Sequence, residues 1–168
     1  MKKVWASAWK LTAYDARADA GIDQSQVQAG ALIQTAVAAT AAGVLVTRHP
    51  TDPTDARHYT INAKHGLGLA VVDGKKIPES LIVNWYNHGI RVLSRSDEET
   101  RLVYDPRGGT RELPNPHKGA PVLTSPMAIR LADTARALTK LFENDRLDIE
   151  WVYEGDELNI VQARPLVG

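Results

Sequence analysis

Residues 147–164 read LDIEWVYEGDELNIVQAR, and this stretch has the clearest structural pattern in the chain. Apolar residues dominate 147–153 and 158–164, and Gly155 and Asp156 between them are typical of a turn. In the first segment apolar and polar residues alternate, which is the period of a strand with one buried face. The stretch therefore predicts two β-strands joined as a hairpin.

The alternation places polar side chains on one face of this hairpin. Asp148 and Glu150 share a face of the first strand, and Gln162 and Arg164 share a face of the second. An odd-numbered loop centred on Asp156 pairs Glu150 with Gln162 and pairs Asp148 with Arg164, whereas a two-residue loop sets polar groups opposite apolar ones. The pattern therefore favours the odd loop. The apolar residues are expected on the other, buried face: Leu147, Ile149, Trp151, Val161 and Ala163.

The polar face of the predicted hairpin has the composition of a site for magnesium and phosphate. Carboxylate and amide oxygens are hard ligands for Mg²⁺, which shares its coordination sphere with phosphate oxygens. An arginine guanidinium binds phosphate through two parallel hydrogen bonds. A cross-strand ion pair on a solvated face accounts for the same residues, and their spacing leaves both interpretations open.

Two helices are expected elsewhere in the chain. Residues 2–20 carry apolar side chains at helical spacing, and we expect Trp5 and Trp9 to pack in the core. Ser125 and Pro126 begin a second helix, with Ser125 as its N-cap. The apolar stripe of this helix consists of Leu131, Ala135, Leu138 and Phe142.

Short strands are expected over most of the remaining chain. They are predicted at residues 31–37, 43–47 and 58–63, and within a hairpin over 80–94 that turns at 87–89. A second hairpin turns at 107–109, and the proline-rich residues 114–121 form a loop. Hairpins placed between helices predict an α+β fold with a mainly antiparallel sheet.

The composition excludes several classes of protein. The chain of 168 residues suits one compact domain or two small lobes that share a core. Its formal net charge of +0 provides no basic surface for nucleic acid or for an anionic membrane. The absence of cysteine excludes disulfides, cysteine-ligated zinc and thiol catalysis. No apolar run reaches the length of a membrane span and no signal-peptide pattern opens the chain, so we expect a cytoplasmic protein.

Six segments resemble, in order, motifs of one known domain family. They are VWAS at 4–7, ALIQ at 31–34, AGVLVT at 42–47, INAKHGLG at 61–68, DIEW at 148–151 and VQARP at 161–165. The family is the nucleotide-binding domain of phosphoenolpyruvate synthase, pyruvate phosphate dikinase and rifampicin phosphotransferase. That domain is an ATP-grasp fold. The resemblance therefore implies that residues 1–168 are the C-terminal portion of an ATP-grasp-like domain that lacks its N-terminal lobe.

The resemblance assigns roles and cofactors to the polar hairpin face. ATP and Mg²⁺ are the implied cofactors, with Glu150 and Gln162 holding the metal and the ATP phosphates. Asp148 would support the metal shell, and Arg164 would contact the phosphates as the catalytic residue. Gln34 would lie beside the strand that cradles adenine. Members of the family use ATP to phosphorylate a histidine on another domain.

The resemblance also implies partners that these residues do not include. The N-terminal lobe that covers the phosphates and the phosphohistidine domain would belong to the same chain or to a separate one, so we expect the 168 residues alone to be inactive. An exposed docking face would favour a homo-oligomer. Leu69 stands where the family has a glutamate. This replacement supports the alternative of a non-catalytic interaction or scaffold module. The phosphoryl acceptor, which is pyruvate, a glucan or an antibiotic in relatives, is bound outside this segment.

Overall fold

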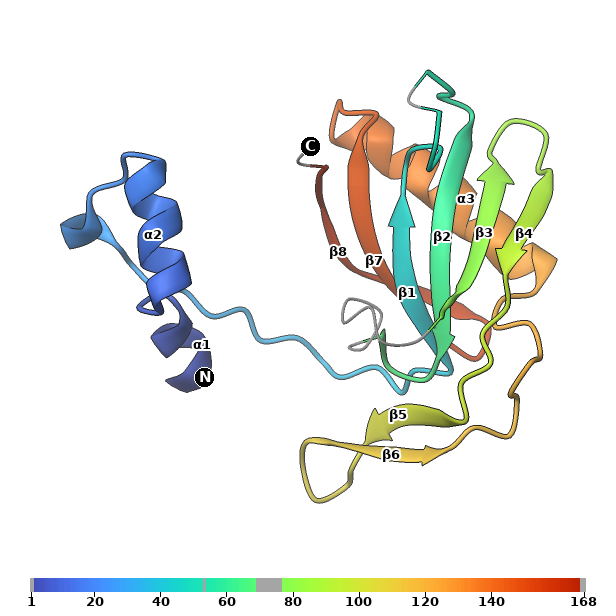
Figure 1. Ribbon diagram of the computed structural model, residues 1–168, viewed down its shortest axis with the longest axis horizontal. Helices are drawn as coiled ribbons and strands as arrows, with labels where there is room; N and C mark the ends of the chain where they lie inside the picture. Colours follow the sequence, from blue (N-terminus) through green and yellow to red (C-terminus); the bar gives the residue numbers. More distant parts are fainter. Residues whose placement is uncertain (1, 53, 69–76, 167–168) are drawn as a thin grey trace. The chain divides into compact units, whose positions relative to one another are not determined.

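The structure, a computed structural model, describes residues 2–52, 54–68 and 77–166 (Figure 1). Leu69, the position of the expected glutamate, lies outside these residues. The chain divides into two compact units, Met1–Ala36 and Val37–Gly168. Each unit is described by itself below.

The N-terminal unit contains two helices where the sequence predicts one. They are α1 (Lys2–Ser7) and α2 (Leu11–Asp19), followed by a 3₁₀ turn at Gln24–Gln26. The Ser7 hydroxyl donates a hydrogen bond of 2.6 Å to the Val4 carbonyl, and the next N–H groups bond three residues back rather than four. Because this side chain competes for the helical carbonyl and the turn tightens, the first helix ends there. The prediction of one continuous helix over 2–20 is therefore wrong.

The prediction that Trp5 and Trp9 pack in the core is also wrong. Their side chains are 47% and 61% exposed, and no described residue of the N-terminal unit is buried. Two helices of six and nine residues form a single layer, and a single layer cannot cover its own apolar face. No helix in the described part of the chain is both long enough and apolar enough to cross a bilayer.

The segment 31–37 is not a strand, although its apolar residues predicted one. Residues 27–39, all of them described, have neither helical nor strand conformation. Leu32 and Ile33 are 84% and 74% exposed. A strand requires a neighbouring strand to bond its backbone groups, and an apolar sequence alone does not supply one.

The second unit is built on a six-stranded sheet whose neighbours are all antiparallel (Figure 1). Its strand order is β4-β3-β2-β1-β7-β8, and its predicted strands from 43 onward are confirmed. The bounds are β1 (Ala41–Val46), β2 (His58–His65), β3 (Glu79–Asn84), β4 (Ile90–Ser94), β7 (Leu147–Glu154) and β8 (Glu157–Pro165). The α+β class with a mainly antiparallel sheet follows directly from this topology.

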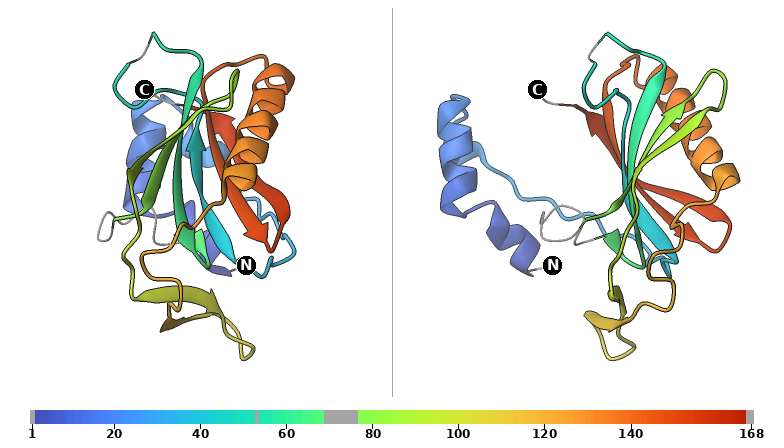
Figure 2. Two further views of the ribbon diagram at one scale, coloured as in Figure 1. Left: turned by 90° about the vertical axis from the view of Figure 1, so that its right-hand side faces the viewer. Right: turned by 45° about the vertical axis from the view of Figure 1, so that its right-hand side comes forward.

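Helix α3 (Ser125–Leu141) covers one face of this sheet (Figure 2). The core lies between the two, and its fully buried side chains include Leu45, Ile61, Leu131 and Ile149. The N-cap of α3 is Thr124, whose hydroxyl accepts a hydrogen bond from the Met127 N–H, and not Ser125 as predicted. Either hydroxyl can cap, and the one directly before the helical backbone does so.

The predicted second hairpin forms a separate two-stranded sheet, β5 (Thr100–Tyr104) with β6 (Thr110–Pro114). The segment leading into it is tied to β2 by a buried ion pair. Lys64 Nζ lies 3.0 Å from Glu98 Oε1, and both side chains are almost fully buried. A buried charge is stable only when it is paired, so this contact fixes where the hairpin leaves the main sheet.

Gly43 lies at the centre of the sheet, opposite Ala63 of β2 and Trp151 of β7. A Cβ atom built on Gly43 would stand 1.9 Å from the Asn62 carbonyl oxygen and 2.8 Å from the Trp151 ring. The Asn62 carbonyl group and the indole ring therefore occupy the space that any other side chain at position 43 would fill. This contact joins the AGVLVT and DIEW segments of the sequence.

Gly43→Ala is expected to lower the free energy of unfolding by at least about 2 kcal/mol, because the added methyl group has no space in the packed sheet. The comparison is Gly30→Ala, where an added Cβ would meet no atom within 4 Å. Urea unfolding followed by circular dichroism measures both variants. Equal stability of the two variants would contradict the packing described for Gly43.

Glu79 of β3 is fully buried and joins the sheet to the segment that precedes α3. Its carboxylate accepts hydrogen bonds of 3.1 and 3.0 Å from the N–H groups of Val122 and Leu123. The guanidinium of Arg95 forms an ion pair with the same carboxylate. These contacts satisfy a charge that has no access to water, and they fix the point from which α3 begins.

Glu79→Ala is expected to cost about 3 kcal/mol of stability, because it leaves two buried N–H groups without an acceptor and Arg95 without its partner. Glu99→Ala breaks an ion pair with Lys118 in which both side chains are exposed, and should cost less than about 1 kcal/mol. Chemical denaturation at neutral pH compares the two. A smaller loss for Glu79→Ala than for Glu99→Ala would overturn the assignment.

Candidate functional site

The β7–β8 hairpin brings the four predicted polar residues together on one face. Glu150 pairs with Gln162, and Asp148 pairs with Arg164, as the sequence pattern predicted. The alternate residues Leu147, Ile149 and Trp151 are buried on the opposite face, against the core under α3. The four polar side chains therefore lie on the face of the sheet that α3 leaves open.

This pairing arises from a different hairpin geometry than the predicted odd loop. Glu154 pairs with Glu157, so the turn contains only Gly155 and Asp156. Gly155 has a φ of +58°, the left-handed conformation that the first position of such a tight turn favours. The prediction of an odd loop is wrong. A two-residue turn also pairs polar residues with polar ones, because the register shifts by one residue further along β8.

That register shift is a β-bulge at Val161. Trp151 pairs with Ile160 whereas Glu150 pairs with Gln162, which leaves Val161 as the extra residue. The apolar positions of β8 change parity here, since Leu158 and Ile160 pack against the core on one side of the bulge and Ala163 does so on the other. A bulge is the usual way in which a strand accommodates such a change. Val161 is thus not a member of the regular buried face predicted for it.

Arg164 is held by Asp148. Its Nε and Nη2 atoms donate hydrogen bonds of 3.0 and 2.7 Å to the same oxygen, Oδ2 of Asp148. The Arg164 side chain is 60% exposed and that of Asp148 only 17%. The carboxylate therefore fixes one edge of the guanidinium while the group as a whole stays accessible to a ligand. The ion-pair interpretation and the phosphate interpretation of these residues are compatible.

Glu150 differs from Asp148 in having no ion pair among the described residues. Its half-buried carboxylate lies across from the exposed amide of Gln162. Together they offer oxygen ligands of the kind that Mg²⁺ prefers. No cluster of three His, Cys, Asp or Glu side chains that could enclose a metal is present in the described ranges. Because Mg²⁺ commonly uses one or two carboxylates and completes its shell with water and phosphate, these residues fit a magnesium–nucleotide complex better than a bare ion.

The open face extends beyond the hairpin in rows set by the strand register. One row runs from Glu150 through Val44 and Asn62 to Ser80. The Ser80 hydroxyl donates a 2.5 Å hydrogen bond to Oδ1 of Asn62. The sequence reasoning did not single out this polar pair. The sequence feature that could have indicated it is the alternation of polar Thr60 and Asn62 with apolar Ile61. Only the strand order shows that β2 lies next to β1 on the side away from β7.

Gln34 belongs to the N-terminal unit, whereas the other four predicted site residues belong to the second unit. It lies on an exposed stretch without strand conformation, within the segment 31–37 where the sequence predicted a strand. A role of Gln34 near adenine stays a prediction.

Comparison with known proteins identifies the same family that the sequence motifs resemble. Residues 1–167 match the model of the pyruvate phosphate dikinase AMP/ATP-binding domain. The chain belongs to this family. It is 34% identical to a rifampicin phosphotransferase of Streptomyces sp. over 169 residues, 99% of the chain and 19% of that protein. It is 32% identical to a probable phosphoenolpyruvate synthase of Pyrococcus horikoshii, over 99% of the chain and 21% of that protein.

A third relative extends the range of chemistries in the family. The chain is 32% identical to the prodigiosin-synthesising transferase PigC of Serratia marcescens, over 99% of the chain and 18% of that protein. The chain thus spans about a fifth of the length of the curated relatives that it matches. These relatives therefore contain further domains beyond the part that the chain matches.

Substitutions on the open face are expected to leave the fold intact. Glu150→Gln and Arg164→Gln should each change the free energy of unfolding by less than about 1 kcal/mol, because Glu150 has no ion pair to lose among the described residues and the Arg164 side chain is largely exposed. Ile149→Ala, next to Glu150 in sequence but fully buried, should cost about 3 kcal/mol. Urea denaturation provides the measurement. A large loss in Glu150→Gln would mean that this carboxylate serves the fold.

Proposed function

We propose that this chain contributes the metal- and phosphate-binding face of the ATP site in a phosphotransferase of the phosphoenolpyruvate synthase type. One observation carries the proposal: Glu150, Gln162 and Arg164 converge on the face of the sheet that α3 does not cover. ATP or AMP binding is the activity by which the matched family is described. The rest of the proposal concerns how these residues would bind Mg·ATP.

Each residue has a distinct part in this proposal. The oxygens of Glu150 and Gln162 hold Mg²⁺, and Asp148 supports the metal site through its place beside Arg164. When bound, Mg²⁺ supplies positive charge to the phosphate oxygens. Arg164, anchored on Asp148, presents its free edge to a phosphate and stabilises charge that develops during transfer. Positioning and electrostatics of this kind account for most of the catalysis in phosphoryl transfer.

The complete enzyme would need parts beyond these residues. We infer an ATP-grasp architecture in which a further lobe covers the phosphates and a separate phosphohistidine domain accepts the phosphoryl group. Large apolar side chains of the N-terminal unit, including Trp5, Trp9 and Leu32, are exposed, which supports docking of another protein layer. The chain alone should bind Mg·ATP weakly and turn over no substrate, since the inferred further lobe would be needed to exclude water from the phosphates.

A non-catalytic role is the second candidate. Leu69 replaces an acidic residue of the family pattern, which removes one negative group from the region of the GLG motif. A scaffold protein that retained the polar hairpin face as a remnant would bind no nucleotide. Nucleotide binding therefore discriminates between the two candidates.

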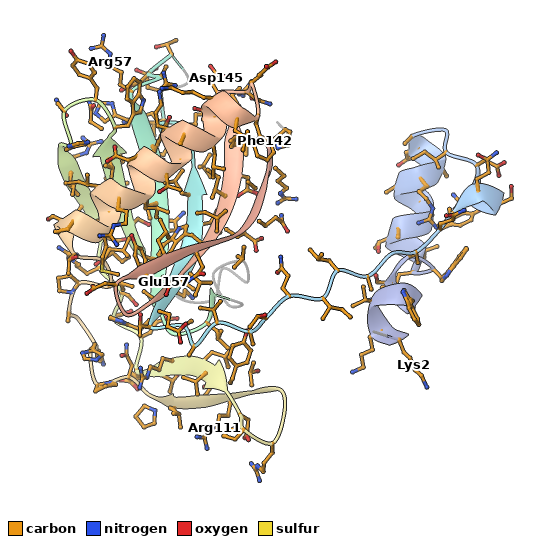
Figure 3. All side chains as sticks on the ribbon, turned by 180° about the vertical axis from the view of Figure 1, so that it is seen from behind. Lys2, Arg57, Arg111, Phe142, Asp145 and Glu157 are labelled. Atoms are coloured by element: carbon orange, nitrogen blue, oxygen red, sulfur yellow. The ribbon has the colours of Figure 1, made fainter. Side chains whose placement is uncertain are left out.

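Titration calorimetry with Mg·ATP should detect binding that chelation of Mg²⁺ by EDTA abolishes. Glu150→Gln and Arg164→Gln should each weaken it by at least about tenfold, because each removes a charged contact. Glu157→Gln is the matched control at the tip of the same hairpin (Figure 3). Its affinity should stay within about twofold of the parent, since a solvated charge is screened.

Two results would contradict the proposal. Binding that is unchanged in Glu150→Gln and Arg164→Gln would move the nucleotide to another surface. No binding at millimolar ATP by a chain whose folding is verified would favour the scaffold role.

A further inference from the structure

The β5–β6 hairpin is attached to the main sheet at the end where β2 finishes (Figure 1). The Leu67 N–H donates a hydrogen bond of 2.8 Å to the Leu102 carbonyl of β5, and Gly66 forms an isolated parallel bridge with Leu102. A Cβ atom built on Gly66 would collide with the same carbonyl oxygen. The backbones of the two segments therefore meet directly, with no side chain between them.

Two histidine rings lie beside this attachment. His65 is the last residue of β2 and directly precedes Gly66, and His117 belongs to the segment that follows β6. Their ring centroids are 5.4 Å apart. His65 is half-buried, whereas His117 is exposed. A proton taken up by His65 would therefore place a positive charge at the point where the hairpin joins the sheet.

The surroundings of His65 suit a neutral ring. Its Nε2 atom is fully buried and has no hydrogen-bond partner within the described ranges. The Nε atom of Arg101, on the neighbouring strand β5, is buried and unpartnered in the same way. An unpartnered polar atom costs free energy when it is buried, and a charged group costs more. Protonation of His65 would thus add a second unsatisfied cation to this junction.

Charged groups from several elements act on the His65 ring. Burial lowers the pKa of His65 most, and the nearby His117 and Arg101 lower it further. Glu79 of β3 and the Ala120 backbone raise this pKa, each by less than burial lowers it. The pKa of His65 therefore lies below its ordinary value, and the ring is neutral at neutral pH.

The buried acids of the described chain already have partners. The Glu79 carboxylate forms its ion pair with Arg95 and accepts two backbone N–H groups. Glu98, in the segment before β5, is paired with Lys64. Both buried carboxylates are therefore committed, and a proton on His65 would be balanced by neither without breaking an existing contact.

We propose that protonation of His65 releases the β5–β6 hairpin from the end of β2, which makes this junction a proton-sensitive contact within the fold. The neutral ring permits the hydrogen bond between Leu67 and Leu102, whereas the charged ring repels Arg101 and His117. Release would free the first residues of the GLG motif from the hairpin, while the core under α3 stays packed. The inference does not depend on nucleotide binding.

The direction of the pH dependence follows from the lowered pKa. Above the ordinary histidine pKa of about 6.5, His65 is neutral whether the hairpin is docked or released, so pH does not affect docking. Below this value the released state binds the proton first. Docking therefore weakens as the pH falls, until the pH passes the lower pKa of His65 in the docked state.

Amide hydrogen exchange followed by NMR between about pH 7.5 and pH 5.5 tests this proposal, after correction for the intrinsic pH dependence of exchange. The Leu67 amide should lose protection by at least about threefold on acidification, whereas the amides of β1 should not. His65→Phe keeps a ring that cannot be protonated and should abolish this dependence. His88→Gln, at a histidine in the turn between β3 and β4, is the matched control and should preserve it.

The second histidine provides a variant that spares the half-buried position. His117→Gln changes an exposed side chain and removes a positive neighbour of His65. The pKa of the His65 ring, measured by NMR titration, should therefore rise toward its ordinary value. The loss of Leu67 protection on acidification should become smaller in this variant, because the pKa difference between docked and released states has decreased. This result is expected even if His65→Phe does not fold.

Three results would overturn the proposal. Protection of the Leu67 amide that is independent of pH would mean that His65 does not control docking. An equal loss at the amides of β1 would mean that acid unfolds the whole sheet. A loss of protection that is the same in the parent, in His117→Gln and in any folded His65→Phe would assign the effect to another group.

Discussion

The contact between Gly43 and Trp151 determines how the rest of the second unit is arranged. The indole ring lies over the backbone of β1 because position 43 has no side chain, and this places β7 beside β1 in one register. That register puts Val44 next to Glu150 and Val46 next to Asp148. The positions of Asp148 and Glu150 beside β1 therefore follow from this close approach of two strands.

The two faces of the sheet have separate tasks. On the covered face, side chains such as Leu45 and Ile61 are fully buried, and Glu79 anchors the segment that leads into α3. On the open face, Arg164 is half held by Asp148, and Glu150 lacks an ionic partner among the described residues. Most of the stabilising contacts lie on the covered face. The open face can therefore carry charged groups whose remaining hydrogen bonds a ligand would complete.

The sequence was informative where structure is local and periodic. Alternation in 147–153 predicted both the strand and the side on which Asp148 and Glu150 lie, and glycine-containing turns predicted the hairpins. The order in which distant strands lie side by side in the sheet could not be predicted from local patterns. The Asn62–Ser80 pair exists because β2 and β3 extend the sheet beyond β1. Trp5, Trp9 and the segment 31–37 were misjudged because apolar spacing does not reveal whether a partner layer is present.

The bulge at Val161 has a consequence for how homologues can differ in length. If Val161 were lost, Ile160 would still oppose Trp151 and the next residue, Gln162, would still oppose Glu150. A single-residue deletion at this one position would therefore preserve both faces, while it removed the local distortion of the strand. Loss of one residue between Gln162 and Arg164 would instead turn the guanidinium toward the helix-covered side. Gaps in this strand should accordingly gather at the position of Val161 during divergence of the family.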